Sequence, residues 1–257
     1  MAERYELSSE LLDTIFTREI APALFRTESP SRNPTLILVG AQPGAGKSRV
    51  NATVMSEHPE PVVAIIGDDL RAFHPAYIDL IRSEPTVMPD ATAQASGQWV
   101  ERSIAYAAEN GISVLVEGTF RRADVTLSTA RRFKERGFRV QVVLLAVSPE
   151  VSRLSIARRY LRDVETSGHG RFTSLVAHNA AYDAIPDTIK AITAAGSPIH
   201  RRREFEVDAL LQPGGALPRR SIGSRPGSRG SQPAVGVRPA VHTPESQGPS
   251  RSPRARP

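Results

Sequence analysis

Cysteine is absent from this sequence of 257 residues, which excludes disulfide bonds and thiolate metal ligands. No apolar run approaches the roughly 18 residues that a membrane-spanning helix needs. The first ten residues, MAERYELSSE, lack the apolar core of a signal peptide. The sequence therefore predicts a cytoplasmic protein that makes no contact with a membrane. Hydrophobic residues make up 40% of the chain, which suits a globular domain.

Lysine is scarce as well, because the chain has three lysines against thirty arginines. One of the three, Lys47, stands in the glycine-rich segment GAQPGAGKS. A compact ammonium group at this position fits a role that the wide guanidinium fork of arginine cannot fill.

Positive charge is concentrated at the C-terminal end. Residues 213–257 carry eight arginines and one glutamate, a net charge of +7 against +6 for the whole chain, which leaves −1 for residues 1–212. The same segment is rich in Pro, Gly and Ser and has no aromatic residue, a composition typical of disorder. We therefore predict one folded domain over residues 1–212 and a disordered tail over 213–257. The nearly neutral domain is not expected to bind nucleic acid.

Short apolar runs alternate with amphipathic segments along the folded part. Strands are predicted at 35–40, 61–67, 112–118 and 139–147, with an edge strand at 203–207. Helices are predicted at about 9–21, 47–57, 100–110, 124–137 and 149–162, with two weaker helices within 173–195. Ser8 or Ser9 would cap the first helix and Pro22 would end it. Apolar strands separated by helices predict an α/β fold with a parallel sheet covered on both faces.

The segment GAQPGAGKS, residues 40–48, lies between the first predicted strand and the next helix. Two of its glycines permit backbone angles that turn N–H groups toward a β-phosphate, the lysine reaches the β and γ oxygens, and the serine hydroxyl suits Mg²⁺. We predict that residues 41–48 form a phosphate-binding loop. Its nucleotide-binding members are Gln42, Pro43, Gly44, Ala45, Gly46, Lys47 and Ser48.

Polar residues follow the next two predicted strands. Asp68 and Asp69 come after the second strand, and Glu117, Thr119 and Arg121 come after the third. Ligands of open parallel sheets bind outside the carboxyl ends of the strands, so we expect these side chains to converge beside the phosphate-binding loop. Carboxylates there can hold Mg²⁺ or take a proton from an attacking hydroxyl group.

A dense group of arginines follows the fourth predicted strand. Arg158, Arg159 and Arg162 lie on one helix, and Arg171 follows the loop SGHG. In nucleotide kinases such a helix and loop form a mobile lid whose arginines neutralise charge on the transferring phosphoryl group, and we place the lid at residues 158–172. The chain has no NKxD or DxxG segment, which argues against a switch GTPase.

Together, GAQPGAGKS, DDLRAFHP, VEGTFRR and RRY followed by an isolated arginine resemble the zeta toxin family. The resemblance covers about residues 10–185. It implies a P-loop kinase-type three-layer sandwich that uses ATP and Mg²⁺ to phosphorylate the 3′-hydroxyl of UDP-N-acetylglucosamine. It also implies that a separate antitoxin protein covers the ATP site.

The resemblance assigns roles to individual residues. Lys47 and Ser48 would hold ATP and Mg²⁺, and Asp68 would be the catalytic base, with Asp69 as the alternative. Arg159 and Arg171 would grip the triphosphate, with Arg158 as the alternative to the first. The substrate-binding residues would be Glu101, Glu117, Thr119 and Arg121.

One residue departs from the family pattern: Phe120 stands where a small residue is common, so we expect it to narrow or reshape the substrate pocket. Two other functions fit the same motifs. One is a P-loop kinase for another hydroxyl acceptor, such as an antibiotic, a nucleoside or a polynucleotide end. The other is an inactive nucleotide-binding protein that acts through its basic tail.

Overall fold

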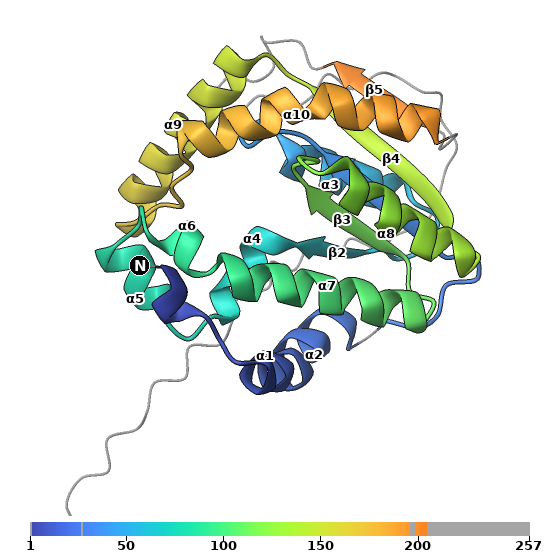
Figure 1. The fold of residues 1–257 in the computed structure, drawn as a ribbon, viewed down its shortest axis with the longest axis horizontal. Coiled ribbons are helices and arrows are strands. Elements are labelled where there is room, and N and C mark those ends of the chain that lie inside the picture. Colours follow the sequence, from blue (N-terminus) through green and yellow to red (C-terminus); the bar gives the residue numbers. More distant parts are fainter. Residues whose placement is uncertain (1, 27, 196–198, 205–257) are drawn as a thin grey trace, which may run out of the picture. The chain divides into compact units, whose positions relative to one another are not determined.

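The computed structural model describes residues 2–26, 28–195 and 199–204. The predicted tail at 213–257, the domain boundary at 212 and residues 205–207 of the predicted edge strand lie outside the described residues. The described part is built on a five-stranded parallel sheet in the order β2-β3-β1-β4-β5 (Figure 1). Its strands are β1 (Thr35–Gly40), β2 (Val63–Ile66), β3 (Val114–Gly118), β4 (Arg139–Ala146) and β5 (Ile199–Glu204). This confirms the four apolar strands. The fifth strand lies at an edge of the sheet, as predicted, but it begins at Ile199, four residues before the predicted start at 203.

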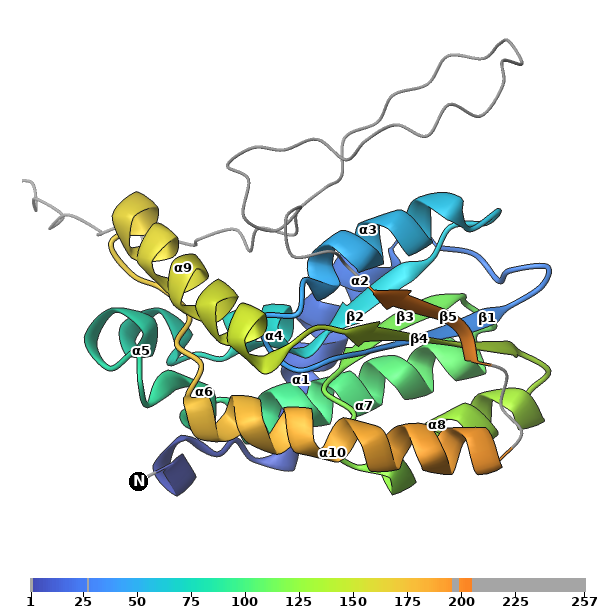
Figure 2. The same ribbon diagram turned by 90° about the horizontal axis from the view of Figure 1, so that it is seen from above.

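Helices cover both faces of the sheet (Figure 2). Along β1, Leu36 and Leu38 pack with residues of α7 (Ala93–Glu109), α8 (Ala123–Glu135) and α10 (Leu175–Ala194). Ile37 and Val39 point the other way and pack against α3 (Lys47–Glu57). All four side chains are buried because successive residues of a strand face opposite sides and both sides are covered. The predicted three-layer α/β sandwich of P-loop kinase type is confirmed.

The first helix continues past Pro22, so the prediction that this proline ends it is wrong. Ser8 caps α1 (Ser9–Ile15) as expected, and a π-helix, η2 (Phe16–Ile20), leads directly into α2 (Ala21–Phe25). The N–H of Ala21 bonds to the carbonyl of Phe16, five residues back. This wider turn places Pro22 in the first turn of α2, where a missing N–H costs little.

Residues 173–195 were predicted to hold two short helices, and this prediction is wrong, because the single helix α10 runs from Leu175 to Ala194. Pro186 lies inside it, which made a break plausible from the sequence. The buried residues His178 and Ala181 before the proline and Thr188 and Ile192 after it show that packing holds both halves as one helix.

Helix α9 (Pro149–Ser167), on which the lid is predicted to begin, is five residues longer than predicted. Ser148 caps its start by accepting a hydrogen bond from the N–H of Val151, and Gly168, in the left-handed conformation with φ +73°, ends it. Shorter helices complete the described part: η1 (Ala2–Tyr5), α4 (Gly67–Leu70), η3 (Arg71–Phe73), α5 (Tyr77–Ser83) and α6 (Met88–Ala91). No helix in the described ranges has the length and apolar character to cross a membrane.

The register of the sheet brings three strand ends level. Gly40 at the end of β1 pairs with Gly118 of β3, and Ile66 at the end of β2 pairs with Glu117. The phosphate-binding loop, α4 and the segment after β3 therefore leave the sheet side by side. Their side chains meet at this carboxyl edge.

Candidate functional site

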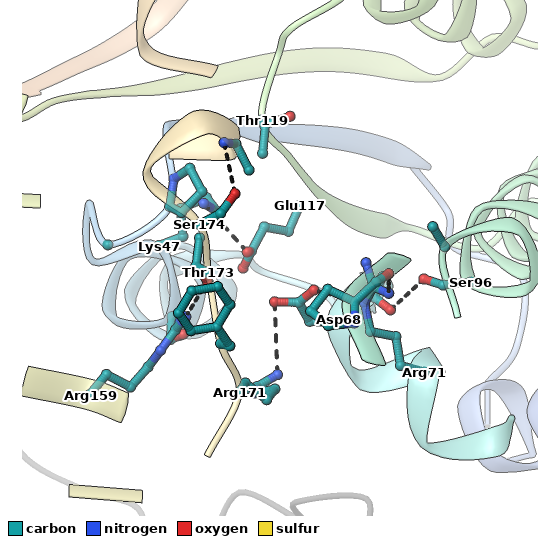
Figure 3. A pocket seen from close by; sticks show the side chains of 18 of the residues that line it. Lys47, Asp68, Arg71, Ser96, Glu117, Thr119, Arg159, Arg171, Thr173 and Ser174 are labelled. Carbon is teal, nitrogen blue, oxygen red and sulfur yellow. Dashed lines mark hydrogen bonds and ion pairs between the residues drawn. The ribbon is translucent and has the colours of Figure 1, made fainter. Parts of the chain in front are cut away.

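A cavity of about 670 Å³ opens at the carboxyl edge of the sheet (Figure 3). Its walls come from the phosphate-binding loop with the start of α3, from α4 and η3, from α6 and the start of α7, from the end of β3 and the segment after it, from α9, and from the loop before α10. The predicted site residues that line it are Pro43, Gly44, Gly46, Lys47, Ser48, Asp68, Glu117, Thr119, Arg121, Arg159 and Arg171. Residues far apart in the sequence thus share one pocket.

The phosphate-binding loop has the backbone that its glycines permit. Gly44 and Gly46 have φ of +80° and +84°, in the left-handed region, and Lys47 begins α3 immediately afterwards. The Nζ atom of Lys47 donates to the carbonyls of Ala41 at 3.1 Å and Gln42 at 3.2 Å. Burial lowers the pKa of Lys47, and the nearby Glu117 carboxylate only partly offsets it. The loop and the helix N-terminus form a concave site that suits an anion.

Two predicted members of the loop do not turn their side chains to the cavity. Gln42 is buried, and its Nε2 atom donates to the carbonyl of Val147 at 2.8 Å and to Ser152 Oγ at 3.3 Å. Ala45 is buried as well, and its N–H bonds to the carbonyl of Gln42. The amide of Gln42 therefore ties the loop to the region between β4 and α9.

Asp68 and Asp69 differ in where they point. Asp68 lines the cavity and Asp69 is not among the lining residues, although their side chains are similarly exposed, at 51% and 63%. The Nη1 atom of Arg171 lies 3.9 Å from Asp68 (Figure 3). The same atom lies 3.5 Å from Asp69. Burial raises the pKa of Asp68, but Arg171 and Arg71 together outweigh it and leave that pKa lowered. Burial leaves the pKa of Asp69 raised.

Glu117 is held by two side chains of α3. Its Oε1 atom lies 3.7 Å from Lys47 Nζ, and its Oε2 atom accepts a 2.7 Å hydrogen bond from Asn51 Nδ2. Asn51 is buried and was not among the predicted site residues. Its place four residues after Lys47, on the same face of a helix, is the signal that could have found it.

Thr119 and Arg121 line the cavity, but Phe120 between them does not. Its ring is 7% exposed and belongs to the hydrophobic core. The expectation that Phe120 narrows the pocket is therefore wrong, and the alternative, that it reshapes the pocket, stays a prediction. The backbone turns this side chain inward, away from the cavity.

Glu101 is not brought to the cavity. Its half-exposed carboxylate lies 3.7 Å from Arg132 of α8. On α7 it is Ser96 that lines the cavity, with its hydroxyl bonded to the carbonyl of Gly67 at 2.7 Å. Glu101 follows five residues later, which rotates it by about 140° around the helix axis at 3.6 residues per turn.

Some of the arginines predicted to belong to the lid line the cavity, and one does not. Arg159 and Arg162 line the cavity, whereas Arg158 is exposed and is not among the lining residues. Arg159 donates to Thr173 Oγ1 at 3.3 Å, and its buried Nε atom has no hydrogen-bond partner. Burial, followed by the like charge of Arg171, lowers the pKa of Arg159. This side chain is therefore a partly desolvated cation that an anion in the cavity would stabilise.

The oxygen ligands near the loop fit Mg²⁺. Ser48, in the first turn of α3, and the carboxylates of Asp68 and Glu117 line the cavity. The described part of the chain contains no cluster of three or more His, Cys, Asp or Glu residues that could hold a metal ion. Mg²⁺ in phosphoryl-transfer sites needs only one or two protein oxygens, because substrate phosphates and water supply the rest.

Comparisons with known proteins agree on one family. The zeta toxin family model matches residues 21–206. Toxin PezT of Streptococcus pneumoniae is 35% identical over 138 residues, which are 54% of each protein. Toxin zeta of Enterococcus hirae is 26% identical over 165 residues, 64% of this chain and 58% of that protein. The chain thus spans a little over half the length of these curated relatives.

One solved structure is similar over most of the fold. It comes from a study of the PezAT chromosomal toxin-antitoxin system of Streptococcus pneumoniae. It superposes with a TM-score of 0.66 and 26% sequence identity, and the match covers 79% of each chain.

Proposed function

The chain belongs to the zeta toxin family, and we propose that it is an ATP-dependent kinase that phosphorylates a sugar hydroxyl of UDP-N-acetylglucosamine. The observation that carries this proposal is that one cavity holds two unlike sets of residues. The phosphate-binding loop lines it together with Asp68, Thr119, Arg121 and Glu117, the last of which lies 3.7 Å from Lys47. A nucleotide and a hydroxyl acceptor can therefore meet within a single pocket.

The nucleotide side would bind the triphosphate of ATP. Backbone N–H groups between Gly44 and Lys47 face the β-phosphate, and the Lys47 ammonium exchanges its loop carbonyls for phosphate oxygens. Ser48 would hold Mg²⁺, which neutralises phosphate charge when bound. Arg159 and Arg171 line the cavity from the lid side, where they would stabilise charge on the transferring phosphoryl group.

The acceptor side would supply the base. The acceptor oxygen forms a bond to the γ-phosphorus, the bond from that phosphorus to the β–γ bridging oxygen breaks, and ADP leaves. The proton of the acceptor hydroxyl passes to Asp68. The lowered pKa of Asp68 keeps it ionised at neutral pH and able to accept that proton. Because Asp68 lines the cavity and Asp69 does not, we assign the base to Asp68.

We also propose that a separate antitoxin protein inhibits this activity. The similar solved structure comes from a study of a toxin-antitoxin system, which supports such a partner. A protein that covers the phosphate-binding loop would compete with ATP, so its presence should raise the apparent Kd of ATP.

A product assay tests the proposal. The full chain is incubated with ATP, Mg²⁺ and UDP-N-acetylglucosamine, and mass spectrometry is used to look for a phosphorylated sugar nucleotide. Lys47→Ala is the control and should yield no product. Absence of product from a protein that binds ATP would overturn the substrate assignment.

A panel of other acceptors separates the alternatives. ADP release with an antibiotic, a nucleoside or a polynucleotide end, but not with UDP-N-acetylglucosamine, would indicate a kinase of different specificity. A variant that lacks residues 213–257 should keep full activity. Two results together would favour an inactive protein that acts through its basic tail. The full chain would show no kinase activity, and the shortened variant would lose a salt-sensitive binding of nucleic acid.

A further inference from the structure

Phe120 has a backbone conformation that its side chain disfavours. Its φ is +52°, the only positive value at a non-glycine residue in the described part of the chain. A bulky residue in this left-handed region is strained and persists only where its surroundings hold it. Its two neighbours, Thr119 and Arg121, both line the cavity.

The ring of Phe120 packs against a glycine. A Cβ atom on Gly40, the last residue of β1, would overlap the Phe120 ring, whereas a Cβ atom on Gly118 would lie at an ordinary contact distance, 3.5 Å from the ring carbon Cδ1. The ring is 7% exposed and packs within the core between the sheet and its helices. The absence of a side chain at Gly40 makes room for it.

The carbonyl of Phe120 is held by a side chain of α10. It accepts a 2.7 Å hydrogen bond from Thr188 Oγ1, and Thr188 is fully buried on α10. A carbonyl in this buried position needs a partner, and the hydroxyl supplies it. Ring and carbonyl are thus held by different elements, which together can maintain the strained turn.

We propose that Phe120 is a positioning residue, whose buried ring and Thr188-bound carbonyl hold the left-handed turn that presents Thr119 and Arg121 to the phosphoryl acceptor. The proposal rests on the proposed kinase function. A return of φ to the usual negative range would redirect the chain after Phe120 and with it the Arg121 side chain. We expect the nucleotide side of the cavity to change little, since its residues belong to the phosphate-binding loop, the first turn of α3 and the predicted lid, and not to this turn.

Two variants test the proposal by different routes. Phe120→Ala removes the ring, and Thr188→Val removes the hydrogen bond but keeps the ring and the shape of the threonine side chain. Both should raise the KM for UDP-N-acetylglucosamine, Phe120→Ala by about tenfold or more, because small displacements of substrate-positioning groups have large effects. The Kd of ATP should stay within about twofold. Phe120→Leu, which keeps an apolar anchor, should recover part of the loss.

Phe138→Ala is the matched control. Phe138 is 5% exposed and lies in the same core cluster, but it precedes β4 at the opposite, amino edge of the sheet. Its loss should lower the Tm as much as Phe120→Ala does, without changing the KM of the acceptor. If Phe120→Ala and Phe138→Ala affect that KM equally, the proposal is overturned.

Amide hydrogen exchange keeps this test separate from the substrate assignment. If the wild-type protein forms no product from UDP-N-acetylglucosamine, the kinase proposal fails, but the turn can still be measured. Exchange at residues 118–122 should become faster in Phe120→Ala and Thr188→Val and stay unchanged in Phe138→Ala. Exchange in that segment that is the same in all three variants would show that Phe120 does not hold the turn.

Discussion

Asn51 donates a 2.7 Å hydrogen bond from Nδ2 to the Glu117 carboxylate, which also lies 3.7 Å from the Lys47 ammonium. A nucleotide in the site would draw Lys47 to its phosphates. Glu117 would then lose its cationic neighbour while it stays largely enclosed, and Asn51 would be the donor that keeps its carboxylate in place. Asn51 therefore has its largest effect in the nucleotide-bound state.

We predict that Asn51→Ala lowers kcat/KM for the acceptor by about tenfold, because Glu117 is free to turn away from the substrate. Asn51→Asp should lower it further, since two carboxylates in contact repel each other. Steady-state kinetics with the acceptor varied at saturating ATP would measure both effects. Thr53→Ala, on the exposed face of the same helix with its hydroxyl bonded to the carbonyl of Arg49, should leave kcat/KM unchanged. Full activity of Asn51→Ala would contradict the role.

The assignment of the base predicts a difference between two adjacent carboxylates. Asp68→Asn should reduce kcat by roughly a hundredfold or more, in line with general-base contributions, and should keep ATP affinity. Asp69→Asn should have a small effect because this side chain points to solvent and not into the cavity. Single-turnover measurements together with a fluorescent ATP analogue separate transfer from binding. The reverse order of effects would move the base to Asp69.

The charge around Asp68 predicts a shift in the pH profile. A base with a lowered pKa stays active as the pH falls, and activity is lost only when the pH passes through that pKa. Arg171 is the strongest of the groups that lower the pKa of Asp68, so Arg171→Gln should raise it. The acid limb of kcat/KM should then move to higher pH, separately from any loss in its maximum.

The charges around Asp68 also affect the stability of the fold, which should fall with decreasing pH, as the activity does. Because its pKa is lowered in the folded protein, ionised Asp68 stabilises the fold above its unfolded-state pKa, and this contribution is lost as the pH falls through the folded-state value. Arg102→Gln is the control, because its partner Asp13 lies on α1, away from the cavity. If the acid limb of kcat/KM shifts in Arg102→Gln as it does in Arg171→Gln, the explanation is contradicted.

Two glycines of the phosphate-binding loop should differ in their tolerance of alanine. Both have positive φ, but a Cβ atom on Gly46 would meet no atom within 4 Å, whereas one on Gly44 would overlap the carbonyl of Ser152 in α9. Gly46→Ala should lower the free energy of unfolding by about 1–2 kcal/mol, the cost of the left-handed conformation. Gly44→Ala should lower it by about 1–3 kcal/mol more, the usual cost of overpacking. Urea denaturation measures both, and equal losses would exclude the predicted clash.

The parts of this structure that the sequence could predict depend on local patterns. Continuous apolar runs marked the four strands of the buried sheet, and the spacing from Ala41 to Ser48 marked the phosphate-binding loop. The parallel arrangement of the strands then placed Asp68 and Glu117 at one edge. Each of these inferences needs only a few neighbouring residues and one rule of sheet geometry.

The parts that could not be predicted depend on partners far away in the chain. The amide of Gln42 is buried because the carbonyl of Val147 accepts from it, 105 residues later. Glu101 lies away from the cavity because packing sets the rotation of α7. The inward turn of Phe120 requires Gly40 and Thr188 together. Contacts between residues so far apart in the sequence cannot be predicted from a local sequence pattern.

Ser152 and His178 form a buried pair beside the phosphate-binding loop. Ser152 Oγ lies 2.7 Å from His178 Nε2, and both residues are fully buried. A serine beside a histidine is also the arrangement of hydrolase nucleophiles, but no substrate can reach a fully buried hydroxyl group. Ser152 accepts from Gln42 of the loop at 3.3 Å, so the pair connects the phosphate-binding loop, α9 and α10. We interpret it as a structural tie.

A double-mutant cycle on this pair tests that interpretation. Ser152→Ala should lower the free energy of unfolding by about 1–3 kcal/mol, because it leaves a buried histidine nitrogen without its partner. His178→Leu removes the same contact, but Ser152 Oγ can still donate to the carbonyl of Ser148 at 3.0 Å, and the double variant should lose less than the two single losses added together. Ser155→Ala, one turn along α9 with its hydroxyl bonded to the carbonyl of Val151, is the control and should have little effect. Strict additivity of Ser152→Ala and His178→Leu in urea denaturation would show that the two side chains do not interact.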